Sequence, residues 1–305
     1  MEGAVPAEEG FIPFRNQRVW YRIVGDREAQ GKLPLLCLHG GPGAAHDYLE
    51  PLEGMATTGR RVIFYDQLGC GRSDHPHDPS LWTVDLFVEE VGVVSKALEL
   101  DRLHLFGNSW GGMLAMEYAL TAPQGLESLV LASSPASIPQ WIAEANRLRS
   151  ELPPDVQETL LNHEEAGTTE DPAYEEAMLV FYRRHLCRLD PWPDYVNRTF
   201  AQLEEDPEVY HTMNGPSEFH VVGTLRDWDI TDRLGEIRVP TLVTSGRHDE
   251  ATPAIAETVH RAIPGSEWVL FEQSSHMAHA EEPEAYRQVL DGFLSRVEAA
   301  DAPYP

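Results

Sequence analysis

Cysteine is scarce in this chain of 305 residues, and its three cysteines stand far apart. Cys37, Cys70 and Cys187 are odd in number and form no CxxC pair. This arrangement argues against a disulfide framework and against a metal or redox site built on paired thiols. We expect each of the three to be a small buried hydrophobic residue.

Long apolar runs and surplus positive charge are also missing. No uncharged apolar stretch reaches the roughly 18 residues of a membrane span, and the start "MEGAVPAEEG" has neither the basic beginning nor the apolar centre of a secretory signal. With 23 basic and 50 acidic residues, the formal net charge of −27 repels nucleic acids and anionic membranes. The sequence therefore predicts a cytoplasmic protein that binds neither nucleic acid nor membrane.

What the sequence does contain is an alternation of short apolar runs with segments of helical period. Hydrophobic residues make up 42% of the chain, which is enough for one large core and a smaller lid. The alternation predicts an α/β fold with a mostly parallel, doubly wound sheet. The expected strands lie in "LPLLCLHG", "RRVIFYDQ", "LHLFG", "LVLASSP", "VPTLVTSGRHDE" and "SEWVLFEQSSH".

Two amphipathic segments, 84–98 and 286–297, place apolar residues on one helical stripe and should pack against the sheet. The tail that follows the second segment, "EAADAPYP", is expected to fray.

The middle of the chain differs from both flanks. From residue 136 to 228 the strand signals vanish, and the sequence becomes helical, acidic and punctuated by prolines. We interpret 136–228 as a helical cap inserted into a catalytic core that is formed by 1–135 and 229–305.

The strongest chemical signal is "LHLFGNSWGG", in which residues 107–111 match G-x-S-x-G between a strand and a helix. A serine on such a turn is pushed above the edge of the sheet, where it can act as a nucleophile. The same motif elsewhere in a chain is often only a glycine-rich turn with an incidental serine. Because strand, turn and helix occur here in register, we predict that Ser109 is a catalytic nucleophile.

A second glycine-rich segment ends an earlier strand. In "LLCLHGGPG" the glycines allow the main chain to approach a substrate carbonyl. We predict that the backbone N–H groups of Gly41 and Trp110 form an oxyanion hole.

A serine nucleophile needs a base and an acid that orients the base. Asp249 follows one expected strand and His276 follows the next, in the chain order of doubly wound hydrolases. We assign His276 as the base and Asp249 as the orienting acid. His279 is the competing base, and we expect it at the periphery of the site or on the surface. The His-x-x-His spacing lacks further ligands, so the sequence predicts no metal and no cofactor.

Several motifs together resemble the proline iminopeptidases of the α/β-hydrolase superfamily, especially the branch of the tricorn-interacting aminopeptidase. The resemblance runs from about residue 11 to 295. It rests on "HGGPG", "YDQLGCGRS", "GNSWGG", "MNGPSEF", "DWDITD", "GRHDEATP" and "SSHMAHAEEP".

The resemblance implies an α/β-hydrolase fold with a helical cap and an enzyme that releases an amino-terminal residue, often proline, from short peptides. It also implies that Glu218 and Glu250 hold the free amino group of the substrate. Two converging carboxylates in a covered pocket resist ionisation unless a cation joins them, which agrees with this role. Asn108 departs from the family pattern, because many relatives carry glycine there.

Three functions stay open on the sequence. The first is the serine exopeptidase just described, acting on a short peptide with a free amino terminus. The second is an amidase or esterase of free amino-acid amides, such as prolinamide, with the same site. The third is a catalytically silent α/β-hydrolase fold that binds a ligand. An aspartate-nucleophile dehalogenase or epoxide hydrolase is disfavoured because the turn carries serine. The sequence does not indicate an oligomeric state.

Overall fold

The computed structural model describes residues 5–300 and contains one twisted sheet of eight strands. The strand order is β1-β2-β4-β3-β5-β6-β7-β8, and all neighbours from β4 to β8 are parallel. The strands are β1 (Ala7–Phe14), β2 (Gln17–Val24), β3 (Leu35–Leu38), β4 (Val62–Tyr65), β5 (Leu103–Asn108), β6 (Leu126–Ala132), β7 (Thr241–Gly246) and β8 (Glu267–Phe271). The predicted α/β fold with a mostly parallel sheet is confirmed.

The apolar runs explain the centre of this sheet. Every residue of β3, β4, β5 and β7 is buried, as expected for parallel strands that are covered on both faces. Parallel strands end at the same edge, so the segments that follow β3, β5, β7 and β8 meet there. The four catalytic segments predicted from the sequence all begin at this edge.

The amino-terminal hairpin was not among the predicted strands. β1 and β2 pair antiparallel, and β2 continues antiparallel onto β4. Their two-residue turn, Arg15 and Asn16, has positive φ values of 45° and 63°, as the tightest hairpin turns require. Asn16, between two segments in which apolar and polar residues partly alternate, is the sequence feature that could have indicated this hairpin.

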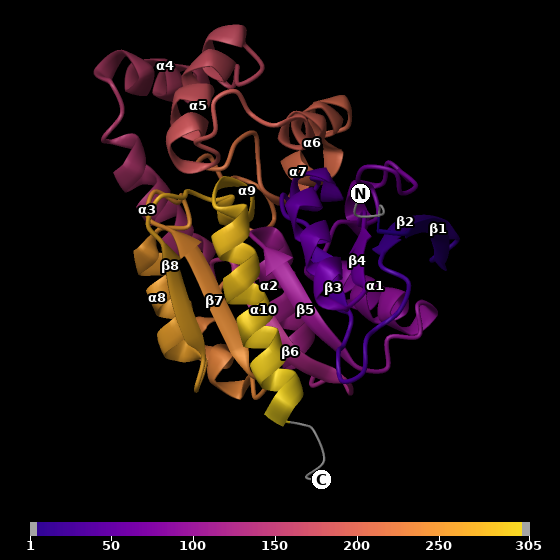
Figure 1. Cartoon of the computed structure of the whole chain (residues 1–305). Coiled ribbons are helices and arrows are strands. Elements are labelled where there is room, and N and C mark those ends of the chain that lie inside the picture. The colour runs from indigo at the N-terminus through magenta and orange to yellow at the C-terminus, as the bar shows by residue number, and fades with distance from the viewer. Residues whose placement is uncertain (1–4, 301–305) are drawn as a thin grey trace.

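Helices cover both faces of the sheet (Figure 1). The predicted segments correspond to α1 (Val84–Ala97) and α10 (Pro283–Ala300). Phe87, Val91 and Val94 of α1 are buried, and the side chain of Thr83 caps its amino end. The remaining core helices are α2 (Trp110–Leu120), α8 (Pro253–Ala262), α9 (Ala278–Glu281) and the 3₁₀ helices η1 (His46–Thr58), η2 (Pro79–Leu81) and η3 (Thr231–Glu236).

The expected frayed tail begins inside α10, which continues to Ala300, so that expectation is wrong for 298–300. Helical hydrogen bonding continues where composition alone suggested an end. Residues 301–305 of the tail lie outside the described residues.

Five α-helices lie between β6 and η3 in the chain, and we call them the cap helices. They are α3 (Ile138–Arg149), α4 (Pro154–Ala166), α5 (Pro172–His185), α6 (Asp194–Glu205) and α7 (Glu208–Met213). α4, α5 and α6 gather beyond one end of the sheet (Figure 1). Proline stands in the first turn of α3, α4 and α5, where no helical N–H partner is lost.

The two ends of this segment meet each other. Ile138 N donates to Trp228 O, and Ile230 N donates to Ala136 O, both at 2.9 Å. This closure supports our proposal that 136–228 is an insertion into the core. Within residues 5–300, no helix has both the length and the hydropathy needed to cross a membrane.

Candidate active site

Ser109 lies at the turn between β5 and α2, with φ 56° and ψ −122°. Positive φ is uncommon for a residue with a Cβ, so the turn is held in place by its surroundings. A Cβ at Gly107 would lie 2.2 Å from Gly111 O, and one at Gly111 would lie 2.2 Å from Leu38 O. The two glycines of G-x-S-x-G are therefore required by the close approach of β5, α2 and β3.

His276 and Asp249 form a buried pair. Asp249 follows β7, His276 follows β8, and His276 Nδ1 lies 2.8 Å from Asp249 Oδ1. Asp249 Oδ1 also accepts from Ala251 N at 2.8 Å, which fixes the carboxylate. Burial disfavours the charged imidazole, but the carboxylates of Asp249, Glu218 and Glu281 together outweigh it and raise the pKa of His276 above its ordinary value.

One cavity brings four of the predicted residues together. Gly41, Ser109, Trp110 and Glu218 all line it. The rest of its wall is mostly apolar: Pro42, Met113, Pro135, Ile138, Trp141, Asn214 and Leu225. The cavity therefore joins a serine and two candidate oxyanion donors to an acidic group through an apolar space.

Glu250 is the most unusual group near the pair. The residue is 1% exposed, and within the described residues neither carboxylate oxygen has a hydrogen-bond partner. Oε1 of Glu250 lies 3.8 Å from His276 Nε2. Burial raises the pKa of Glu250 well above its usual range, and repulsion from Glu218 and Asp249 raises it further.

Glu218 comes from the segment that follows α7 and lines the same cavity as Ser109. The Tyr210 hydroxyl donates to its Oε1 at 2.8 Å. Burial raises the pKa of Glu218 as well, although His276 and Tyr210 oppose the rise. Two carboxyl groups with raised pKa values, Glu218 and Glu250, thus lie near His276. A bound cation would stabilise the ionised form of both.

We expect Glu250→Gln to stabilise the folded protein at neutral pH. The pKa of Glu250 is higher in the folded protein than in the unfolded chain, so ionisation costs stability once the pH exceeds the ordinary glutamate pKa. Removing the charge should raise Tm by about 2 °C for a gain on the order of 1 kcal/mol. Calorimetry at pH 8 and pH 4 tests this, because the gain should vanish at pH 4. A lower Tm at pH 8 would contradict it.

The cap contacts the loops that carry Glu250 and His276 through one main-chain carbonyl that no sequence motif identifies. His185 O, at the end of α5, accepts hydrogen bonds from Glu250 N and from His276 N, each at 3.2 Å. Glu281 adds a second link, because its carboxylate accepts from Arg188 N at 2.6 Å and from the Ser275 hydroxyl at 2.8 Å. Main-chain contacts of this kind have no residue signature.

His279 does not lie on the surface, so that part of the prediction is wrong. It is 1% exposed, and its Nε2 contacts Tyr48 O at 3.1 Å. The short helix α9 turns the side chain inward against η1. Burial lowers the pKa of His279 to about 4. Across residues 5–300, no group of three or more His, Cys, Asp or Glu side chains is placed to hold a metal ion.

Comparison with known proteins agrees with this geometry. A family model described as alpha/beta hydrolase fold matches residues 34–283. The proline iminopeptidase of Saccharolobus solfataricus is 41% identical over 295 residues, which cover 96% of this chain and 94% of that protein. The chain belongs to the proline iminopeptidase family of α/β hydrolases. It is therefore a hydrolase, as the sequence resemblance predicts.

Two solved structures closely resemble this chain. VinJ is 47% identical, with a TM-score of 0.92, and the match covers 95% of this chain and 99% of that one. The proline iminopeptidase of Mycobacterium smegmatis is 44% identical, with a TM-score of 0.90, and the match covers 97% and 100% of the two chains. The likeness thus includes the cap segment as well as the core.

Proposed function

We propose that this hydrolase is a serine aminopeptidase that releases an amino-terminal residue, preferentially proline, from short peptides. Ser109 Oγ attacks the carbonyl carbon of the first residue and passes its proton to His276 Nε2. Asp249 orients the imidazole through Nδ1 and stabilises its charged form. The N–H groups of Gly41 and Trp110 receive the negative oxygen of the tetrahedral intermediate.

The second half of the cycle releases the product. His276 gives its proton to the nitrogen of the leaving peptide, and the C–N bond breaks to leave an ester on Ser109. Water then attacks the ester while His276 accepts a proton from it. The proton returns to Ser109 Oγ, and the free amino acid leaves.

The observation that carries the proposal is the buried carboxylate of Glu250, which has no hydrogen-bond partner among the described residues and lies 3.8 Å from His276 Nε2. A buried charge is costly unless a counter-charge joins it. A protonated amino terminus supplies that charge. In an aminopeptidase substrate the terminal amine belongs to the residue whose carbonyl is attacked, so it lies close to the scissile bond. Glu218 and Glu250 would therefore hold the terminal amine while the adjacent carbonyl meets Ser109.

Two features support proline as the first residue. A protonated proline nitrogen has two N–H groups, which two carboxylates can accept one each. Its apolar ring suits the wall formed by Met113, Ile138 and Trp141.

Cytoplasmic location stays a prediction from the sequence.

The alternative amidase or esterase activity would use the same amine contacts, so substrate length separates the two. We expect kcat/KM to be higher for prolyl dipeptides and tripeptides than for prolinamide, because the leaving peptide adds contacts beyond the scissile bond. Release of proline from the three substrates can be followed by chromatography. Equal or faster cleavage of prolinamide would make this an amino-acid amidase.

A further inference from the structure

The two proposed oxyanion donors belong to separate segments of the chain. Gly41 lies in the loop after β3, whereas Trp110 begins α2. Donors of this kind act only when each N–H lies about 2.7–3.1 Å from the developing oxyanion. The distance between the two segments must therefore be fixed by something other than the donors themselves.

Tyr48 forms one connection between the two segments. Its hydroxyl accepts a hydrogen bond from Gly40 N and donates one to Asn108 Oδ1, both at 2.8 Å. Gly40 precedes one donor, and Asn108 lies two residues before the other. The Tyr48 side chain is 3% exposed, so water does not compete freely for these bonds.

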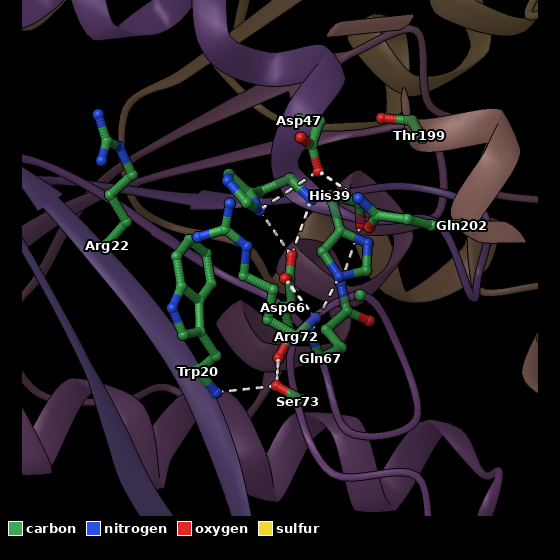
Figure 2. Close-up of polar contacts among 12 residues, drawn as sticks. Trp20, Arg22, His39, Asp47, Asp66, Gln67, Arg72, Ser73, Thr199 and Gln202 are labelled. Atoms are coloured by element: carbon green, nitrogen blue, oxygen red, sulfur yellow. Dashed lines mark hydrogen bonds and ion pairs between the residues drawn. The ribbon is translucent and has the colours of Figure 1, made fainter. Parts of the chain in front are cut away.

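Gln67 forms a second connection from a different loop, the one that follows β4. Its Nε2 donates to His39 O at 2.9 Å, and its Oε1 accepts from Trp110 Nε1 at 2.8 Å. Gln67 N also donates to His39 Nε2 at 2.9 Å, and Figure 2 shows the two residues facing each other. Gln67 is fully buried.

These bonds have a common pattern. Each connection joins His39 or Gly40, just before Gly41, to Asn108 or Trp110, on either side of Ser109. Tyr48 fills both the donor and the acceptor capacity of its hydroxyl in doing so. Because Tyr48 occupies the N–H of Gly40, that group is not free to serve an oxyanion. The pattern also gives Asn108 a specific partner in Tyr48.

We propose that Tyr48 and Gln67 are positioning residues that set the separation of the oxyanion donors Gly41 and Trp110. The proposal rests on the serine mechanism proposed above. Neither side chain is assigned contact with substrate. Each acts on the transition state by keeping the His39–Gly41 segment at a fixed distance from the start of α2.

The test compares Tyr48→Phe, Gln67→Met and the double variant with Tyr286→Phe. Tyr286 is a matched control because it is another buried tyrosine, and its hydroxyl lies 2.9 Å from Thr244 Oγ1 in β7. We expect each single change to lower kcat about tenfold with KM within about twofold, since the lost contacts matter in the transition state. The double variant should lose more than the product of the two single losses, because one connection supports the segment when the other is absent.

A second readout does not depend on the peptide substrate. Labelling of Ser109 by a fluorophosphonate places a phosphoryl oxygen where the oxyanion would lie, so its rate should fall in the same order. Trp110→Phe removes the same hydrogen bond to Gln67 Oε1 by deleting its donor, Trp110 Nε1. Its effect should not add to that of Gln67→Met. This pair keeps the proposal testable if the double variant does not fold.

Equal kcat for Tyr48→Phe and Tyr286→Phe would overturn the proposal, as would losses confined to KM. A wild-type protein that is labelled rapidly but cleaves no peptide would instead overturn the proposed function. In that case the labelling rates of the variants still decide whether Tyr48 and Gln67 position the two donors.

Discussion

Ser109→Ala should lower kcat on proline para-nitroanilide by at least about 10⁴-fold, with little change in folding. Removing the nucleophile of a serine triad leaves only the catalysis that the oxyanion donors and substrate binding supply. Alanine removes a single oxygen from a side chain that is 8% exposed, so the cavity and its charges should be preserved. Release of para-nitroaniline under saturating substrate measures the effect, and fluorophosphonate labelling should be lost in parallel.

Ser95→Ala is a suitable control for this change. Ser95 is also buried, and its hydroxyl donates to Val91 O within α1 at 2.8 Å, remote from the triad residues in the chain. We expect wild-type kcat for this variant and a thermal stability close to that of Ser109→Ala. Wild-type turnover by Ser109→Ala would show that another group is the nucleophile, and the proposed mechanism would then fail.

Much of the candidate site could be predicted because its signals are local. The G-x-S-x-G turn needs glycine at 107 and 111 for steric reasons that involve only adjacent elements. Asp249 and His276 could be placed because each directly follows an apolar strand, and parallel strands end at one edge. The same logic failed for the amino-terminal hairpin, whose strands are partly exposed and therefore lack a continuous apolar run.

Other parts of the site depend on contacts between distant segments, which no motif encodes. The sequence places Glu250 beside Asp249, but it does not show that both carboxylate oxygens are buried without a hydrogen-bond partner among the described residues. The contact of His185 O with the loops that carry Glu250 and His276 uses only main-chain atoms. Tyr48 lies outside the motifs quoted above, and the motif "YDQLGCGRS" contains Gln67 without indicating its contacts. The roles of both residues follow only from the way two loops meet. His279 was misplaced for the same reason, because one helical turn of α9 decides whether its side chain faces inward.

The amine contact is expected to produce the second large effect. Acetylation removes the positive charge of the substrate, and Glu250→Gln removes one of the two acids that would receive it. Each charge-assisted hydrogen bond contributes about 1.5–3 kcal/mol, so either change should lower kcat/KM about 10- to 100-fold. Glu272→Gln is the control, since it removes the same charge from an exposed carboxylate four residues before His276.

The two changes act on one contact, so their effects should not add. Once Glu250 is neutral, acetylation should cost less than it costs the wild type. This coupling separates an amine anchor from a structural acid, because a structural acid would lower kcat/KM equally for both substrates.

The most direct measurement is kcat/KM for proline para-nitroanilide and its N-acetylated form, each with the wild type and with Glu250→Gln. The proposed function predicts that acetylation costs the wild type at least about tenfold, and that this cost shrinks in the variant. Equal cleavage of the free and acetylated substrates by the wild type would contradict the amine anchor. The protein would then be a general amidase or esterase in which Glu250 has a structural role.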